Sequence, residues 1–178
     1  MANGGSLFLD EVTELTLPAQ AKMLRVIQEW EFEPLGSVKT LKANIRIIAA
    51  TNKDIQSLVR EGRFREDLYY RLYVYPITLP PLRERPEDLP VLIDSFIEGM
   101  NREMGRKVRG VTREAHNILL KYHWPGNVRE LQNVIERLMI LSQSDLIDGS
   151  DLPRYLRDEM GITRGLSKTW TGFRKVFR

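Results

Sequence analysis

The stretch Gly5-Ser-Leu-Phe-Leu-Asp-Glu-Val12 decides the fold of this chain. Its apolar run, Ser6 to Leu9, is short, follows glycines and carries hydrophobic side chains on both faces, which is typical of a buried strand in a parallel sheet. Two adjacent carboxylates, Asp10 and Glu11, come directly after this run. Because ligands of open parallel sheets bind beyond the carboxyl ends of the strands, we expect the pair to face a ligand.

Adjacent carboxylates at a strand end suit a metal-assisted hydrolysis. Asp10 would hold a magnesium ion through its water shell, and Glu11 would take the proton from an attacking water. The pair equally suits the first turn of a helix, where acidic side chains are favoured, and both interpretations stay open on these residues alone. A phosphate-binding Gly-rich loop needs a Gly-Lys pair, and no glycine here is followed by lysine.

A second candidate follows another apolar run, Ile45 to Ala50, which we predict to be a second buried strand. Asn52 comes just after it, at what should be the same edge of the sheet. Its amide would bind a phosphate oxygen or position a water. An asparagine after a strand is also common in turns, so this alternative stays open.

Three arginines are candidates for binding a phosphoryl group. Arg65 and Arg71 belong to one predicted helical segment, and guanidinium groups stabilise the charge that develops on a transferring phosphoryl group. The alternative is a solvated helix in which Asp67 pairs with Arg71 at i,i+4. Arg129 stands in the first turn of a predicted helix, where a cation opposes the helix dipole unless an anion lies nearby. An exposed surface arginine is the alternative.

The first 81 residues alternate between predicted strands and helices. Pro18 suits the first turn of a helix. The helix that Pro18 begins has an apolar stripe of Met23, Leu24, Ile27 and Trp30, and a loop or weak hairpin over 31–44 follows it. Two more helices are predicted, one capped by Asp54 that ends near Arg60 and one over Glu66–Leu72. A third strand is predicted over Val74–Leu79, and it stops at Pro80-Pro81.

Only helices are predicted after the double proline: a long one beginning near Glu87, one capped by Thr112, one opened by a capping box of Asn127 and Glu130, and a short one over Asp151–Met160. The predicted fold is therefore α/β. A partial parallel sheet of about three strands lies in residues 1–81, a small all-helical domain in 82–160 and a basic amphipathic tail in 161–178.

Composition excludes several classes of protein. The 178 residues are 42% hydrophobic and 29% charged, as in ordinary globular proteins, and they contain no cysteine, which rules out disulfides and thiolate zinc sites and fits a cytoplasmic location. No apolar run approaches the ~18 residues of a membrane span. Residues 164–178 hold five bases and no acid, so the rest of the chain is nearly neutral.

The tail has an apolar face of its own. Leu166, Trp170, Phe173 and Phe177 recur at helical spacing, with most of the basic residues opposite them. Such a face suits an anionic membrane surface or a partner groove. A helix packed on the preceding domain is the alternative.

Five longer stretches follow one another along the chain: Ala2–Glu11, Ala49–Asn52, Gly62–Leu72, Leu79–Asp88 and Trp124–Leu131. In this order they resemble the Walker B segment, sensor I, the arginine-finger segment, the link to the helical lid and sensor II of the bacterial enhancer-binding proteins. These are AAA+ ATPases that activate the sigma-54 form of RNA polymerase, and the resemblance covers about residues 2 to 160.

The resemblance implies a role for each candidate residue, with ATP and Mg²⁺ as cofactors. Asp10 would serve the magnesium, Glu11 would polarise the water and Asn52 would sense the terminal phosphate. Arg65 and Arg71 would enter the site of a neighbouring subunit, so activity would need a ring, usually a hexamer. Arg129 would contact nucleotide from the lid of its own subunit, and residues 32–44 would form a loop that moves with nucleotide state.

The sequence also departs from the family pattern, because it includes neither the Walker A loop nor a helix-turn-helix through which DNA would be bound. We therefore expect this segment to be inactive alone and to serve sigma-54 RNA polymerase only within a complete activator. The family pattern also places a further strand beside Val74–Leu79, so residues 1–81 alone should lack their native arrangement, whereas 86–160 should fold more independently. Two alternatives stay open: a non-enzymatic module that binds nucleic acid, membrane or protein through its tail, and a chain that poisons rings of intact relatives.

Overall fold

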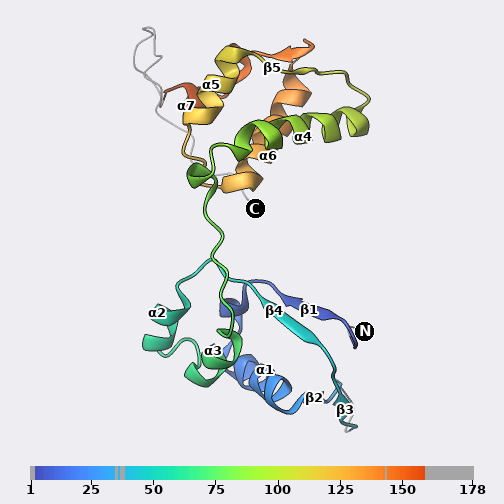
Figure 1. Cartoon of the computed structure of the whole chain (residues 1–178), viewed down its shortest axis with the longest axis vertical. Helices are drawn as coiled ribbons and strands as arrows, with labels where there is room; N and C mark the ends of the chain where they lie inside the picture. Colours follow the sequence, from blue (N-terminus) through green and yellow to red (C-terminus); the bar gives the residue numbers. More distant parts are fainter. Residues whose placement is uncertain (1–2, 35, 37–38, 143, 159–178) are drawn as a thin grey trace. The chain divides into compact units, whose positions relative to one another are not determined.

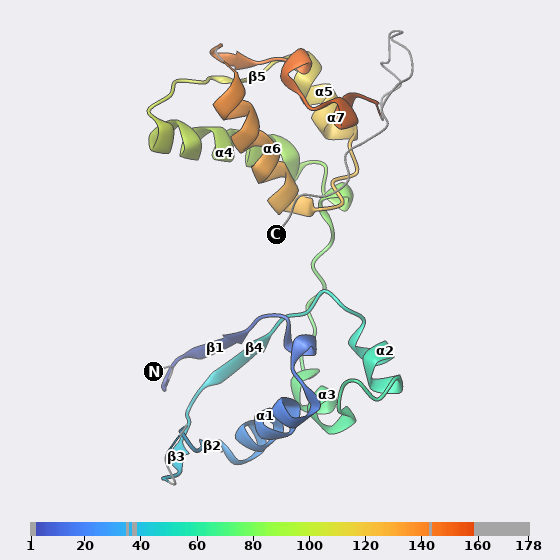
Figure 2. The same ribbon diagram turned by 180° about the vertical axis from the view of Figure 1, so that it is seen from behind.

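The computed structural model describes residues 3–34, 36, 39–142 and 144–158. The chain divides into two compact units, residues 1–78 and residues 79–178. The first is a mixed α/β structure and the second is mainly helical (Figure 1), and Figure 2 shows both from behind. None of the described helices is long and apolar enough to cross a membrane.

Two parallel strands organise the first unit. β1 (Ser6–Leu9) pairs with β4 (Arg46–Ala49) in a register that sets Ser6 opposite Arg46 and Leu9 opposite Ala49. Both strands fall where the apolar runs predicted them. Their parallel pairing brings the two strand ends to the same edge, as the alternation of strands and helices along the chain requires.

Three helices lie on one side of this strand pair in both views (Figure 1; Figure 2). They are α1 (Leu17–Glu29), α2 (Ile55–Arg60) and α3 (Glu66–Leu72). Their apolar side chains form a small core with Ile47 of β4 packed against it; its buried members are Leu24, Ile27, Leu58, Phe64 and Leu68. Beyond α1, β2 (Glu31–Phe32) and β3 (Leu41–Lys42) form the predicted weak hairpin.

The opposite face of the strand pair is bare, which contradicts the prediction of strands buried on both faces. Successive side chains of a strand point to opposite faces, so Phe8 and Ile48, which pair in the register, lie on the side away from Ile47. Phe8 is 59% exposed and Ile48 is 44% exposed. The described helices cover only one side, so only one face is buried.

The prediction of a third strand over Val74–Leu79 was wrong. These residues form a turn and an extended segment without strand pairing, and the four large apolar side chains Val74, Tyr75, Ile77 and Leu79 are 73–83% exposed. The physical reason is that no described strand lies beside the segment to pair with it. Pro76, which has no N–H to donate, restricts such a segment to the edge of a sheet. Among the described residues, the parallel sheet of the first unit therefore has two strands, β1 and β4.

Helix ends in the first unit follow the predicted capping chemistry in part. The Asp54 carboxylate accepts hydrogen bonds from the backbone N–H groups of Gln56 (3.0 Å) and Ser57 (3.3 Å), which confirms it as the cap of α2. Pro18 lies in the first turn of α1, also as predicted. Trp30 was placed on the apolar stripe of α1, but it ends the helix in a left-handed conformation and is 44% exposed.

The second unit is built around two packed helices. α4 (Asp88–Met104) packs on α6 (Asn127–Leu141), and α5 (Arg113–Lys121) and α7 (Arg154–Asp158) complete the helices of the described residues. β5 (Gly110–Val111) and β6 (Leu146–Ile147) pair in parallel, so the prediction of an all-helical domain was wrong in this detail. Short 3₁₀ turns precede α4 and α7: η2 (Leu82–Glu84) and η3 (Gly149–Asp151).

A large continuous core stabilises the second unit. Trp124 is a fully buried member of this core, and its indole Nε1 donates to the carbonyl oxygen of Leu119 at 2.9 Å, so burial leaves no polar atom of the ring unpaired. Thr112 caps α5 as predicted, because its hydroxyl accepts from the backbone N–H of Ala115. The short helix predicted over Asp151–Met160 begins only at Arg154, and the amphipathic tail lies outside the described residues.

The size of its core predicts that the second unit is stable when it is separated from the first. Residues 79–158 alone should unfold cooperatively, and Leu131→Ala, at a fully buried position, should lower the free energy of unfolding by about 2–5 kcal/mol. Val91, which is 70% exposed, provides the control: Val91→Ala should change the free energy of unfolding by less than about 0.5 kcal/mol. Denaturant titrations followed by Trp124 fluorescence measure both, and equal effects would contradict this core.

Acid should destabilise the second unit through Asp148. The Thr112 hydroxyl donates to this carboxylate at 2.9 Å, and this bond, with others from Ser150, holds the pKa of Asp148 below its usual 3.8. A pKa that is lower in the folded state adds stability above pH 3.8, which is lost as the pH falls through the folded value. Asp148→Asn should flatten the fall in melting temperature below pH 4, whereas Asp145→Asn, at an exposed neighbour, should leave it unchanged.

Candidate functional site

The parallel strand pair sets the acidic pair and Asn52 at one edge of the sheet. The backbone N–H of Ala50 donates to the Leu9 carbonyl at 2.8 Å, and the N–H of Val12 donates to the Ala50 carbonyl at 3.0 Å. These bonds continue the pairing beyond the last strand residues, so the chain leaves both strands side by side. Asp10, Glu11 and Asn52 all follow within the next residues, as the sequence predicted.

Glu11 has the most unusual conformation at this edge. Its backbone is left-handed (φ 49°, ψ 47°), which is strained for a residue with a side chain and marks functional sites more often than other positions. Its Oε2 atom is buried and has no hydrogen-bond partner among the described residues. Asp10 Oδ1 accepts the N–H of Glu11 at 3.0 Å, which supports this turn. A buried carboxylate oxygen without a partner is available to accept a hydrogen bond from a ligand or a water.

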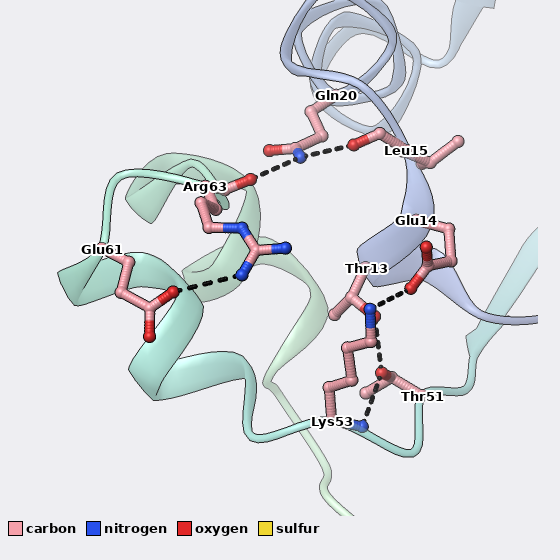
Figure 3. Close-up of polar contacts among 8 residues, drawn as sticks. All are labelled: Thr13, Glu14, Leu15, Gln20, Thr51, Lys53, Glu61 and Arg63. Atoms are coloured by element: carbon pink, nitrogen blue, oxygen red, sulfur yellow. Dashed lines mark hydrogen bonds and ion pairs between the residues drawn. The ribbon is translucent and has the colours of Figure 1, made fainter.

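Polar contacts tie the loop after the acidic pair to the loop that carries Asn52 (Figure 3). The hydroxyls of Thr13 and Thr51 hydrogen bond at 2.8 Å, and the backbone N–H of Lys53 donates to the Thr51 hydroxyl at 3.1 Å. The Lys53 ammonium forms an ion pair with Glu14 and lowers the pKa of that carboxyl. Asn52 thus lies between two anchored residues, while its own side chain is exposed.

Arg65 and Arg71 lie at opposite ends of α3. Arg65 occupies the N-cap position of α3 without a side-chain capping bond, and its guanidinium donates to both carboxylate oxygens of Asp67, at 3.0 and 2.6 Å. This bidentate pair raises the pKa of Arg65 and lowers that of Asp67. The alternative pairing of Asp67 with Arg71 was therefore wrong. Arg71, exposed in the last turn, has no ion pair within the described part of the chain.

No described contact joins either arginine to Asp10, Glu11 or Asn52. The acidic edge and the finger segment are instead linked through Gln20, which sequence analysis did not single out. Gln20 is fully buried on α1, and its amide bonds the backbone of Leu15 on one side and of Arg63 and Arg65 on the other. A signal was available, because Gln20 precedes Leu24 and Ile27 at i,i+4 and i,i+7, on the apolar face of the helix.

Arg129 lies in the second unit, beside a pocket of about 480 Å³ formed by the first turns of α6 and Tyr155 of α7. Arg137 also lines it, and neither guanidinium has an ion pair among the residues that the structure describes. Glu130, the acid in this wall, is occupied: it accepts from the N–H of Gly126 (2.8 Å) and the hydroxyl of Tyr122 (3.2 Å). Two unpaired cations in one concave surface suit an anionic ligand.

The start of α6 differs from the predicted capping box. Gly126 is the N-cap, and Asn127 adopts a left-handed conformation (φ 52°) inside the first turn. The Asn127 side chain accepts the backbone N–H of Leu82 at 2.8 Å, so it fastens the start of this unit rather than its own helix. Glu130 supplies its half of the box, but to Gly126. The Oδ1 atom of Asn127 does not cap the helix, because it accepts the N–H of Leu82, a residue far away in the sequence.

The carboxylates of Asp10 and Glu11 suit a magnesium ion, which completes its coordination with water and phosphate, better than a metal whose ligands all come from protein side chains. Among the described residues there is no cluster of three or more His, Cys, Asp or Glu side chains that would hold an ion. Mg²⁺ keeps several waters and takes one or two carboxylates together with phosphate oxygens. Asp10, exposed and next to Glu11, fits such a site when a nucleotide supplies the phosphates.

Comparison with known proteins identifies both units. Residues 1–78 match the family described as "Sigma-54 interaction domain", and residues 83–167 match "AAA+ ATPase lid domain". Nitrogen fixation protein AnfA of Azotobacter vinelandii is 51% identical over 93% of this chain and 32% of its own length. DNA-binding transcriptional activator HyfR of Escherichia coli K12 is 49% identical over 83% of this chain and 22% of its own. The chain thus spans about a third of such relatives or less.

Solved structures agree. NtrX from Brucella abortus in complex with ADP matches with a TM-score of 0.80 at 40% identity, over 85% of this chain and 36% of that one. The same protein in complex with ATP matches with a TM-score of 0.79 at 37% identity, over 90% and 41%. From these matches and the fold, the chain belongs to the AAA+ sigma-54 interaction family, and it carries the C-terminal portion of that domain as found in sigma-54-dependent transcriptional activators.

Proposed function

We propose that this segment forms the hydrolytic and intersubunit part of the ATPase site of a sigma-54-dependent activator. The observation that carries the proposal is Glu11, which has a strained backbone and a buried, unpaired carboxylate oxygen at the same sheet edge as Asp10 and Asn52. Such an oxygen is suited to a general base, because it has no competing partner among the described residues and lies at the ligand edge of the sheet.

Each residue at this edge has one task. Asp10 holds Mg²⁺ together with water molecules, and Glu11 orients and deprotonates the attacking water. Asn52 donates its amide to the terminal phosphate, from a loop fixed on both sides by Thr51 and Lys53. Bound ATP and its Mg²⁺ supply the electrophilic phosphorus and part of the charge neutralisation.

The arginines act from two directions. Arg65 and Arg71 enter the site of the neighbouring subunit, which agrees with the lack of any described contact between them and the acidic edge of their own chain. Arg129 binds the nucleotide of its own subunit from the lid. Its guanidinium, which has no ion pair among the described residues, lines the α6 pocket, and this supports the role. The active form is therefore a homo-oligomeric ring, which we propose to be a hexamer, working in the cytoplasm.

In the complete activator this ring remodels sigma-54 RNA polymerase, and DNA is bound by a domain other than the two described here. The AnfA and HyfR matches support this assignment, because both run through the two units. The alternative of a binding module that uses the basic tail is not favoured, and its tail lies outside the described residues. Most of the chain matches parts of an AAA+ domain instead.

Measurements of ATP hydrolysis by the complete AAA+ domain and by its single variants test the proposal. This chain alone should not hydrolyse ATP, and it should do so once the upstream half of the AAA+ domain, with its phosphate-binding loop, is restored. In that domain Glu11→Gln should lower kcat about 10²–10⁴-fold by removing the base, and Arg65→Ala about 10³-fold or more by removing the finger.

Mixing the two variants should recover activity, because a subunit with Glu11 intact then receives Arg65 from its Glu11→Gln neighbour. Steady-state phosphate release on rings purified by size measures the recovery. Mixed rings that stay as inactive as either parent would refute the shared site. As a matched control, Arg60→Ala, which removes an exposed arginine at the end of α2, should leave the rate within about twofold.

A further inference from the structure

We propose that Gln20 is a positioning residue that fixes the finger segment of each subunit, so that Arg65 reaches the site of its neighbour. The inference rests on the proposed function, because a finger acts only where a ring and a shared site exist. It adds a residue from another helix, α1, to the machinery of that site.

The amide of Gln20 is bonded at both of its ends. Nε2 donates to the carbonyl oxygens of Leu15 (2.8 Å) and Arg63 (3.1 Å), and Oε1 accepts the backbone N–H of Arg65 (2.9 Å). Figure 3 shows Gln20 reaching between the chain at Leu15 and the chain at Arg63. Both amide protons and the oxygen thus have partners, which is the condition for burying this side chain completely.

Two of these bonds flank Phe64. This ring is 2% exposed and belongs to the core formed with Leu58 and Leu68. The residues on either side of it are held by Gln20, so the segment is fixed by an apolar anchor and by a polar clamp around that anchor. Arg65 is the N-cap of α3, and the bond to its N–H fixes the direction in which its side chain leaves the backbone.

Gln20 binds the finger segment at more points than it binds the acidic loop. On the acidic side it binds one backbone group, the Leu15 carbonyl, and that loop has bonds of its own, such as the N–H of Val12 to the Ala50 carbonyl. On the finger side it binds two backbone groups, the Arg63 carbonyl and the Arg65 N–H, where the N–H groups of Arg63 and Phe64 also donate to the Leu58 carbonyl. The Arg65 N–H has no other acceptor among the described residues, so loss of the amide leaves it unpaired.

The clamp also links the two halves of the machinery in one subunit. Leu15 ends the 3₁₀ turn η1 (Val12–Glu14), which follows the acidic pair and is bonded to the Asn52 loop through Thr13 and Thr51. Gln20 thereby joins the turn after the acidic pair to the finger segment through a single side chain.

Gln20→Met tests this role, because methionine has a similar length and shape and no amide. In the complete AAA+ domain, kcat should fall about ten- to a hundredfold, as expected when a reacting group is misplaced by about an ångström. The KM for ATP should stay within about twofold, since no nucleotide-binding group is removed. Gln28→Met, on the exposed side of the same helix, is the matched control and should leave both constants unchanged.

Hydrogen exchange gives a readout that does not depend on hydrolysis. In the same domain, the amide of Arg65 should exchange at least about tenfold faster in Gln20→Met than in the unaltered protein or in Gln28→Met, because it has lost its acceptor. Amides of the α1 core, such as Leu24, should keep their protection. Unchanged exchange at Arg65 would overturn the clamp itself.

Mixed rings then show in which site Gln20 acts. Gln20→Met should regain activity with Glu11→Gln, which supplies a sound finger to an intact acidic pair, and should not regain it with Arg65→Ala. The reverse pattern would place Gln20 in the acidic loop, and recovery with neither would reduce it to a folding role; both overturn the proposal. Glu11→Gln with Arg65→Ala is the reference pair, and its failure would sink the proposed function rather than the role of Gln20.

Discussion

Everything at the candidate site depends on the parallel pairing of β1 with β4. This pairing, and not any contact between the side chains themselves, brings Asp10, Glu11 and Asn52 to one edge. A slip of one residue would turn each side chain to the other face of the sheet, so the register is as important as the residues. Three helices packed on one face, through Ile47 and the core around Phe64, hold that register.

Local polar contacts then convert this edge into a connected site. Thr13 and Thr51 join the two loops, and the ion pair of Lys53 with Glu14 adds a second tie. Both are exposed, so each adds little stability by itself. Their effect is geometric: Asn52 and the strained Glu11 are held at neighbouring loops, and the buried amide of Gln20 extends the same framework to the finger segment.

Sequence patterns predicted the elements that local chemistry determines. The apolar runs gave β1 and β4, Asp54 and Thr112 gave two helix starts, and the order of motifs pointed to the family. Patterns failed where a distant partner decides the outcome. Asn127 bonds Leu82 instead of capping its helix, and Asp67 pairs with Arg65 rather than with Arg71. The role of Gln20 cannot be predicted from sequence patterns, because it depends on two loops that only the fold brings together.

Pro76 limits how the uncovered segment 74–79 can ever be used. A proline cannot donate a backbone hydrogen bond, and it is tolerated in sheets on border strands, where only one side is joined to a neighbour. The run of exposed side chains from Val74 to Leu79 therefore suits the outermost position of a wider sheet. A strand that docks there would leave the proline-bearing flank facing solvent, and the sheet could not grow further in that direction.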